Sequence, residues 1–300
     1  MKQDLPLVSV AIITYNQRDY LKECIESCLE QDYPNFEIVV ADDYSTDGTQ
    51  DMLRSYDLEY PGKFVLCLAE KNQGITLNSN VAHFACSGKY IAWMGGDDLM
   101  LPEKLSKQVS YMETNDDCAI CYSDSEVFDS SSGKTIAYSS KLSPRIDGNI
   151  RHMIRYGCFV GGCTAMVRRN STPKHGFDSR VPIASDWLYW VESLENGGKI
   201  NYLDYILSKH RRHNDNITSN EKNNFRIELL QDHLISASII LSKYPFYYKD
   251  VSRVMSHHLR GMRWYKGGLY YRKYLLASMR SNFNAKAFFG YALSFFGIKK

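Results

Sequence analysis

The segment KYIAWMGGDDLM places two adjacent carboxylates, Asp97 and Asp98, directly after an apolar run and two glycines. In a continuing strand the two side chains would point to opposite faces. Gly95 and Gly96 permit a turn that brings both carboxylates to one side. Two carboxylates held together repel each other unless a cation lies between them, and Mg²⁺ and Mn²⁺ prefer carboxylate and phosphate oxygens as ligands. Asp97 and Asp98 are therefore the predicted ligands of a divalent metal ion.

Polar residues also follow two other apolar segments nearer the N-terminus. Thr14-Tyr15-Asn16 comes after the run that ends at Ile13, and Asp42-Asp43 comes after a run that begins at Phe36. A carboxylate at the end of a strand can accept hydrogen bonds from a base or from the hydroxyls of a ribose. We therefore expect Asp42 and Asp43 to contribute to a nucleotide site.

The segment DDYSTDGTQD allows two further interpretations. Asp43 and the residues after it have calcium-loop spacing, but the twelfth position of such a loop is a bidentate glutamate and here it is Arg54, which excludes an EF-hand. Ser45, Thr46 and Asp47 are residue types that cap helices. We expect both roles together: the serine and threonine cap the next helix, while the acids before them bind a ligand.

The first 125 residues alternate predicted strands and helices. The strands are Leu7–Ile13, Phe36–Ala41, Phe64–Leu68 and Tyr90–Met94, and the helices are Tyr20–Glu30, one after DDYSTDGTQD, Ile75–Cys86 and one that Pro102 opens and that ends near Met112. This alternation predicts an α/β fold with a parallel sheet and helices on both faces. Such sheets bind ligands at the carboxyl ends of their strands, where the three polar clusters would meet.

Beyond residue 123 the regular alternation fades. GCFVGGCTAMVRR indicates a glycine-rich loop that leads into a strand, and ASDWLYWVESLENGG indicates a helix ended by glycines. Gly161 and Gly162 could let a ligand approach the backbone closely, or could simply form a tight turn. Trp187 and Tyr189 could stack on a sugar, although core packing is the favoured interpretation. Phe225–Leu241 has the spacing of a further helix.

The charge is unevenly distributed. Residues 251–300 hold ten Lys and Arg and no Asp or Glu, so the first 250 residues hold 26 of the 36 bases and all 34 acids, a net charge of −8. The basic tail is also rich in Trp, Tyr and Phe, a combination that suits an anionic membrane surface. Nucleic acid is the competing anion, and a helical cap with a solvated basic face is the third interpretation.

Neither a signal peptide nor a membrane-spanning segment is predicted. The apolar run from Leu7 to Ile13 is short and meets polar residues, and no stretch approaches the roughly 20 apolar residues that span a bilayer. We therefore expect a cytoplasmic location. The eight cysteines are expected to be reduced and mostly buried, since Cys118-Ala-Ile-Cys121 lies in a predicted strand rather than at the start of a helix.

The chain closely resembles the opening of family 2 glycosyltransferases over VSVAIITYNQRDYLKECIESCLEQDYPNFEIVVADDYSTDGT, and the resemblance continues through NQGITLNSN, GKYIAWMGGDD and GFD to about residue 218. It implies the GT-A fold, a Rossmann-like, mostly parallel sheet flanked by helices, here with a C-terminal helical extension. It also implies inverting transfer of a sugar from a nucleotide diphosphate sugar, usually a UDP-sugar, with Mn²⁺ or Mg²⁺.

The resemblance also implies roles for three parts of the chain. Residues 1–125 would be the nucleotide-sugar-binding half, residues 126–220 the acceptor-binding half with the catalytic base, and residues 221–300 a helical, basic and aromatic C-terminal region. The implied nucleotide-sugar-binding residues are Thr14, Asn16, Asp42, Asp43, Asn72 and Asp97. Of these, Thr14 and Asp43 would contact the uracil and ribose region.

The metal and the base are carried over in the same way. Asp98 would be the main metal ligand, with Asp97 near the ribose or the metal and His213 on the metal or the diphosphate. GFDSRVPIASDW matches the family stretch that ends in the catalytic base, which falls on Asp186. A helix-start acid favoured by the helix dipole is the other interpretation of Asp186. The family often has a further acid where Gly95 stands, and an acid where Ser185 stands.

These expectations combine into an inverting glycosyltransferase that acts at the inner face of the plasma membrane. The expected acceptor is a glycan, or a glycan linked to undecaprenyl diphosphate, in O-antigen or capsule synthesis, with an anionic membrane surface and no nucleic acid as partner. Two alternatives stay open at this point. A sugar-phosphate nucleotidyltransferase would share the sheet and the metal but needs a glycine-rich, arginine-containing phosphate loop, and a glycan-binding scaffold could carry a degenerate site.

Overall fold

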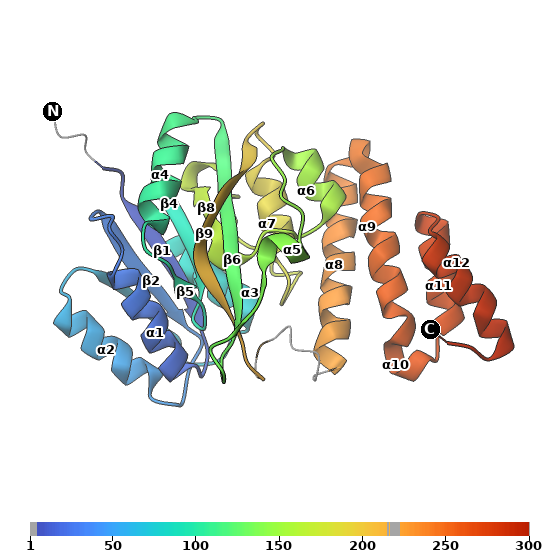
Figure 1. The fold of residues 1–300 in the computed structure, drawn as a ribbon, viewed down its shortest axis with the longest axis horizontal. Coiled ribbons are helices and arrows are strands. Elements are labelled where there is room, and N and C mark those ends of the chain that lie inside the picture. The colour runs from blue at the N-terminus through green and yellow to red at the C-terminus, as the bar shows by residue number, and fades with distance from the viewer. Residues whose placement is uncertain (1–4, 215, 217–222, 300) are drawn as a thin grey trace.

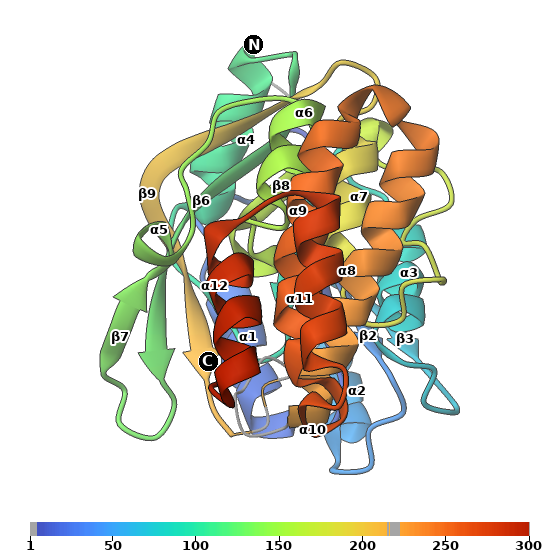
Figure 2. The ribbon, with the colours of Figure 1, turned by 90° about the vertical axis from the view of Figure 1, so that its right-hand side faces the viewer.

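The computed structural model describes residues 5–214, 216 and 223–299. A central sheet with helices on both faces forms the body of the molecule, and the C-terminal helices stack outward from one side of it (Figure 1). Figure 2 shows the helices α11 (Tyr271–Ser281) and α12 (Ala285–Leu293) as the outermost layer of that stack. The boundary predicted at residues 220 and 221 lies outside the described residues.

Nine strands form one sheet over the described residues. They are β1 (Val8–Thr14), β2 (Phe36–Asp42), β3 (Phe64–Leu68), β4 (Tyr90–Gly95), β5 (Leu99–Met100), β6 (Cys118–Asp129), β7 (Thr135–Tyr138), β8 (Ala165–Arg168) and β9 (Lys199–Arg212). Their order is β3-β2-β1-β4-β8-β6-β9-β5, and β7 pairs with β6. The strands β1 to β4 are mutually parallel, β6 pairs in parallel with β9, and β8 joins the two groups as an antiparallel strand. The predicted mostly parallel α/β sheet is confirmed.

The helices lie between and after these strands. They are α1 (Arg18–Leu29), α2 (Thr49–Glu59), α3 (Ile75–Ala85), α4 (Lys104–Thr114), α5 (Ser139–Leu142), α6 (Ile150–Tyr156), α7 (Asp186–Ser193), α8 (Asn223–Lys243), α9 (Tyr248–Gly261), α10 (Tyr265–Gly268), α11 (Tyr271–Ser281) and α12 (Ala285–Leu293). The predicted helix over Phe225–Leu241 is confirmed as part of α8.

The two faces of the sheet pack against different helices, because side chains alternate along a strand. On β1, Val8, Val10 and Ile12 are buried with residues of α1, α2 and α4. Ala11, between them, is buried with residues of α3, α6 and α7 on the other face. Fully apolar strands are typical of a sheet that is covered on both sides.

Two local predictions about helix starts are wrong. Pro102 does not open α4, which begins at Lys104 after Glu103, a residue in the left-handed conformation (φ 64°). Ser45 and Thr46 do not cap α2, whose N-cap is Gly48 (φ 88°). The Asp47 carboxylate instead accepts from the Thr49 amide (3.1 Å), so only the acid of the predicted trio serves that helix end.

The C-terminal helices form a chain of contacts that starts at the body. Helix α8 packs against α7 and α9, α9 against α11, and α11 against α12. In the part of the chain that the structure describes, no helix is long and apolar enough to span a bilayer. The eight cysteines are all free, and Cys118 and Cys121 lie in β6 as predicted.

Candidate active site

The carboxyl ends of β1, β2 and β4 lie side by side, as their order in the sheet requires. The Asp43 amide donates to the Thr14 carbonyl (3.0 Å), and the Gly96 amide donates to the Ile13 carbonyl (3.0 Å). The three polar clusters are thus brought together at one edge of the sheet, where ligands of parallel sheets bind.

Asp97 and Asp98 lie in the turn after β4, which the Asp98 amide closes by donating to the Gly95 carbonyl (3.1 Å). Both carboxylates lean toward Gly95. A Cβ atom on this glycine would stand 2.8 Å from Asp97 Oδ1 and 3.4 Å from Asp98 Oδ2. The absence of a side chain at Gly95 therefore leaves the space in which the two carboxylates meet on one side of the turn.

The other oxygens of the two carboxylates are held by β9 and the residues after it. His213 Nε2 lies 3.0 Å from Asp97 Oδ2, to which Asn216 Nδ2 also donates (2.9 Å). His210 Nδ1 lies 3.0 Å from Asp98 Oδ1, which also accepts from the Arg211 amide (3.0 Å). Each carboxylate is thereby oriented with its second oxygen toward the gap at Gly95.

The buried guanidinium of Arg211 also holds the turn that contains Asp97 and Asp98. Its Nε donates to the Asp97 carbonyl (2.8 Å), and one of its terminal nitrogens pairs with Glu23 of α1. Burial alone would raise the pKa of Asp97, but the hydrogen bond and charge of His213 outweigh it and lower that pKa. Burial alone would lower the pKa of His210, but the Asp98 carboxylate outweighs it and raises that pKa.

A divalent metal ion fits the residues of this turn. Among the described residues, Asp98, Cys163 and His210 bring their ligand atoms within 4.8 Å of one another. Burial raises the pKa of the Cys163 thiol well above its ordinary value, so a protonated, soft sulfur adjoins the site and is a poor ligand for a hard ion. Asp98 and Asp97, which face each other across Gly95, supply the oxygens that Mn²⁺ and Mg²⁺ prefer.

The histidines occupy positions around these acids. His210 holds Asp98 in place, as residues behind a metal ligand commonly do. His213, predicted as a ligand, contacts Asp97 and also packs its ring against Tyr20 (4.7 Å between ring centroids). Its role as a metal ligand stays a prediction.

Two of the residues predicted to bind a nucleotide hold the loops after β1 and β2 together. Asp42 is fully buried and accepts from Gln50 Nε2 (2.8 Å) and from both the amide and the hydroxyl of Ser45. The backbone N–H of Asn16 donates to Ser45 Oγ (2.7 Å), and the side-chain Oδ1 of Asn16 accepts from the backbone N–H of Thr46 (2.8 Å). The loops after β1 and β2 are thus locked to each other at the sheet edge.

The remaining nucleotide candidates lie on the side of α3. The Asp43 carboxylate accepts from the amides of Gln73 (2.7 Å) and Gly74 (2.8 Å), just before that helix begins. Asn72 Nδ2 donates to the Asp43 carbonyl (3.3 Å). Thr14 Oγ1 is buried and has no hydrogen-bond partner in the described part of the chain. These residues are brought together, whereas their contact with a nucleotide stays a prediction.

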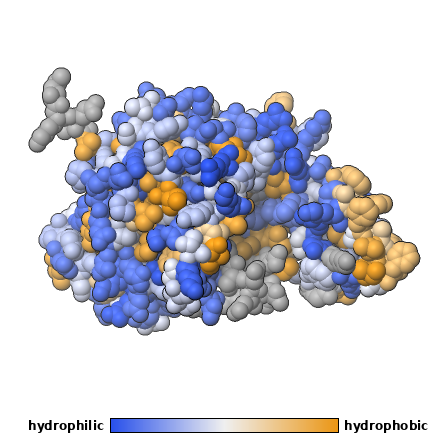
Figure 3. Space-filling view, viewed as in Figure 1, coloured by the Kyte–Doolittle hydropathy of each residue, from blue (hydrophilic) through white to orange (hydrophobic). Residues whose placement is uncertain are grey.

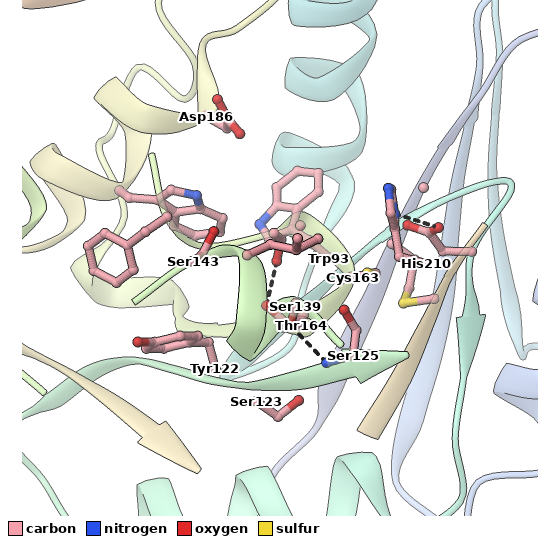
Figure 4. A pocket seen from close by; sticks show the side chains of 18 of the residues that line it. Trp93, Tyr122, Ser123, Ser125, Ser139, Ser143, Cys163, Thr164, Asp186 and His210 are labelled. Atoms are coloured by element: carbon pink, nitrogen blue, oxygen red, sulfur yellow. Dashed lines mark hydrogen bonds and ion pairs between the residues drawn. The ribbon is translucent and has the colours of Figure 1, made fainter. Parts of the chain in front are cut away.

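A cavity of about 440 Å³ joins the acidic turn to Asp186. Figure 4 shows His210 and Cys163 at one end of it and Asp186 at the other, with Trp93 and Ser139 between them. The indole Nε1 atoms of Trp93 and of Trp190, which also lines the cavity, are buried and have no partner in the described structure. Further lining comes from the serines of β6 and α5 and from Gly161 and Gly162.

Asp186 is the first residue of α7 and is half-buried. Its Oδ1 accepts from the Trp187 amide (2.8 Å), and the Cys158 thiol donates to its Oδ2 (3.2 Å). Burial raises the pKa of that thiol well above its ordinary value, so the sulfur keeps its proton as a donor. The Asp186 carboxylate is therefore held at the N-terminus of α7, where it lines the cavity in a defined orientation.

The loop before Asp186 is fixed from two sides. Asp232 of α8 accepts from the amides of Ile183 (2.7 Å) and Ala184 (2.9 Å) through one oxygen. Thr76 of α3 contacts Ser185 Oγ (2.8 Å) and donates to the Val181 carbonyl (2.6 Å). The candidate base is thus positioned by helices from both the N-terminal half and the C-terminal region.

The aromatic residues of α7 belong to the core, as favoured by the sequence. Trp187 is fully buried and donates its indole N–H to the Met153 carbonyl (3.0 Å). Tyr189 stacks on Phe177 with 4.0 Å between ring centroids. Neither ring is exposed enough to stack on a sugar.

Sequence reasoning missed His210, Cys163, Cys158 and Asp232. His210 lies in the stretch KHRRHNDNIT, residues 209–218, and strand alternation along it would have placed His210 and Arg212 on the opposite face from Arg211. The other three carry no local signal, because each acts on a residue that is far away along the chain.

The model of the family described as Glycosyl transferase family 2 matches residues 9–175. TuaG of Bacillus subtilis (strain 168), which is named a teichuronic acid biosynthesis glycosyltransferase, is 28% identical over 219 residues that cover 72% of this chain and 83% of TuaG.

Two solved structures show the same fold. S. aureus TarS in complex with UDP-GlcNAc matches with a TM-score of 0.63 and 17% identity, over 91% of this chain and 81% of that chain. The mannosyltransferase PcManGT from Pyrobaculum calidifontis, in complex with GDP-Man and Mn²⁺, matches with a TM-score of 0.61 and 18% identity, over 98% of this chain and 80% of that chain. The predicted GT-A fold is confirmed.

The Gly95 gap leads to a first prediction. Gly95→Ala should weaken Mn²⁺ binding in the presence of UDP roughly tenfold, because its Cβ would displace the Asp97 carboxylate (2.8 Å). Isothermal titration calorimetry measures the affinity. Gly162→Ala is the matched control, since a Cβ there meets no atom within 4 Å, and it should keep the wild-type affinity. Equal affinities for all three proteins would contradict the proposed arrangement of the carboxylates.

The anchor of the base loop leads to a second prediction. Asp232→Ala should destabilise the fold by about 2–3 kcal/mol, because it leaves two amides without an acceptor. Hydrogen exchange should accelerate at Ile183 and Ala184. Asp250→Ala is the control, since it removes another buried acid of the helical region, one that pairs with Arg151 and Arg155 instead. That variant should lose stability without faster exchange at the loop, and faster exchange in both would argue against a specific anchor.

Proposed function

The chain belongs to glycosyltransferase family 2, and from this premise we propose that it transfers a sugar from a UDP-sugar to a glycan acceptor with inversion at the anomeric carbon. The proposal depends on one observation above all: a single cavity is lined by Asp98 of the acidic turn at one end and by Asp186 at the other. A donor with its diphosphate at the first end would present its sugar toward the second.

The donor end is supported by the residues at the strand ends. Residues 1–125 form the proposed donor half, in which Thr14 and Asp43 adjoin the nucleoside and Asp97 adjoins the ribose. The exposed ring of Tyr15, next to Thr14, offers a face on which a base would stack. TarS has been solved with UDP and with UDP-GlcNAc, and PcManGT with GDP-Man, which favours a nucleotide sugar of this kind.

Asp98 and Asp97 are the proposed ligands of a divalent cation, Mn²⁺ or Mg²⁺, with His210 as the residue that orients Asp98. A cation held there would neutralise charge on the diphosphate as it departs. His213 and Arg211 hold the same turn through Asp97. These contacts keep the carboxylates of Asp97 and Asp98 oriented toward one point. Without them, the repulsion between the two negative charges would turn the carboxylates apart.

Asp186 is the proposed general base of the acceptor half, residues 126–220. The acceptor hydroxyl would donate its proton to a carboxylate oxygen of Asp186 while its own oxygen bonds to the anomeric carbon. The bond from that carbon to the diphosphate breaks at the same time, and the nucleotide leaves with its electron pair. One carboxylate is sufficient, because the acceptor displaces the nucleotide directly from the opposite face.

The acceptor is proposed to be a lipid-linked glycan, such as one on undecaprenyl diphosphate, in surface polysaccharide synthesis. The teichuronic acid assignment of TuaG supports a polysaccharide product. The aromatic and serine side chains around the cavity suit the faces and hydroxyls of sugars. A nucleotidyltransferase would instead release diphosphate, and a binding scaffold would release nothing, so measured UDP release separates the three.

A thermal-shift experiment tests the donor site. UDP-sugars with Mn²⁺ should raise the melting temperature of the wild type, and Asp98→Ala should lose most of that shift because the cation no longer bridges the protein and the diphosphate. Asp51→Ala removes an acid of α2 that is 89% exposed and should keep the shift. An equal shift in the Asp98→Ala protein would rule out the proposed ligand.

A second experiment tests the base. Asp186→Asn preserves shape and should keep donor binding while turnover falls about 10²–10⁴-fold, the usual contribution of a general base. Asp178→Asn is the control, since this acid pairs with Arg180 earlier in the same loop. UDP release and donor affinity are measured on both. Turnover that survives in the Asp186→Asn protein would assign the base to another residue.

A further inference from the structure

Helix α12 buries its small residues and exposes its large ones. Ala287 and Gly290 are buried, and a Cβ on Gly290 would already stand 3.2 Å from Leu275 of α11. The contact between α12 and α11 is therefore made by these two small residues together with the partly buried Tyr291. An amphipathic helix of a globular protein normally does the opposite and turns its large apolar side chains toward the core.

The large apolar side chains of α12 and its flanks point into solvent. We call them the aromatic face, and it consists of Phe283, Phe288, Phe289, Phe295, Phe296 and Ile298, which are between 42% and 81% exposed. Phe289 lies in α12, and Phe296 lies in the 3₁₀ turn that follows it (Ser294–Phe296). The rings of Phe283, Phe288 and Phe289 lie within 6.1 Å of one another in succession.

Figure 3 shows hydrophobic surface gathered at the end of the molecule where α11 and α12 lie. Exposed apolar residues scattered singly are normal, whereas a contiguous group marks a site of contact with a partner or a membrane. In the described structure no segment of this chain covers the aromatic face, so its partner must come from outside.

Exposed cations lie on the same helices as the aromatic face. Arg272, Lys273, Arg280, Lys286 and Lys299 are exposed on α11, on α12 and after them. The Arg272 guanidinium lies 4.1 Å from the ring centroid of Phe295, so charge and aromatic surface adjoin directly. No acidic residue occurs anywhere in residues 251–300. This part of the chain therefore combines exposed apolar and cationic side chains and contains no Asp or Glu.

We propose that the aromatic face of α12 docks on the interface of an anionic lipid bilayer. Aromatic rings would enter the headgroup region, and the surrounding Lys and Arg would pair with lipid phosphates. Helix α12 has nine residues and would lie in the plane of the interface rather than cross it. The inference goes beyond sugar transfer and does not depend on it.

Charge argues for lipid rather than for a second copy of the chain. In a two-fold symmetric dimer the same patch would meet itself, which would set this group of cations against an identical one. A lipid headgroup layer supplies both the apolar depth that the phenylalanines need and the negative charge that the cations need. The patch therefore complements a membrane surface and is not self-complementary.

Vesicle co-sedimentation with the full chain tests the proposal. The protein should bind vesicles of phosphatidylcholine mixed with phosphatidylglycerol, bind pure phosphatidylcholine vesicles much less, and dissociate as salt is added. The double variant Phe289→Ser, Phe296→Ser should bind roughly tenfold more weakly or worse, because two rings no longer enter the interface. Phe246→Ser is the matched control, since that ring is 95% exposed in the turn between α8 and α9 and should not matter.

Two further measurements close the test. Lys286→Glu should weaken binding to anionic vesicles and leave binding to phosphatidylcholine vesicles unchanged. Lys134→Glu, on the hairpin between β6 and β7, should bind both kinds of vesicle as the wild type does. Sedimentation velocity without lipid reports the oligomeric state. A dimer that the double variant abolishes, or equal vesicle binding by the double variant and the wild type, would overturn the proposal. Melting temperatures of the variants show whether each is folded, and UDP release stays a separate readout that the double variant should retain.

Discussion

The site depends on a steric constraint at the end of β4. In this structure the two carboxylates meet in the space that Gly95 leaves open, since a Cβ there would stand 2.8 Å from Asp97 Oδ1. Repulsion between the acids would still drive them apart, so the structure holds each from behind. His213 and Asn216 bind one, and His210 and the Arg211 amide bind the other. The position of β9 in the sheet, between β6 and β5, is what brings these four groups to the turn.

The proposed donor half, residues 1–125, could be predicted from the sequence in most of its structural detail. Its strands and helices are local patterns, and a parallel sheet forces the carboxyl ends of β1, β2 and β4 onto one edge. The strand predicted at Phe64–Leu68 has the observed bounds, and the helix predicted at Ile75–Cys86 ends one residue earlier. What failed were cap assignments, since the side chains of Ser45 and Thr46 are engaged by Asp42 and Asn16 instead of by α2. Tertiary contacts compete with local capping, and here they prevail.

The surroundings of Asp186, the proposed acceptor side, could be predicted only in part, because long-range packing builds them. The motif that ends in Asp186 was visible, but the residues that hold it were not. Cys158 precedes Asp186 by 28 residues, Thr76 precedes Ser185 by 109, and Asp232 follows Ala184 by 48. No periodicity or spacing rule connects such residues. The loop before the candidate base thus contacts α3, α7 and α8. Its conformation is determined by these tertiary contacts and not by its own sequence alone.

The C-terminal helices contribute at two opposite faces. The inner face of α8 fixes the loop before Asp186, while the outer face of α12 carries the exposed rings and cations. If α12 docks on anionic lipid as proposed, electrostatics would also orient the molecule, because the first 250 residues carry a net charge of −8 and are repelled by the surface that attracts the tail. A lipid-linked acceptor and the protein would then both be confined to the membrane surface. This confinement raises the effective concentration of the acceptor at the cavity without any added contact between them. Weak contacts between the cavity and the acceptor would be sufficient under that arrangement.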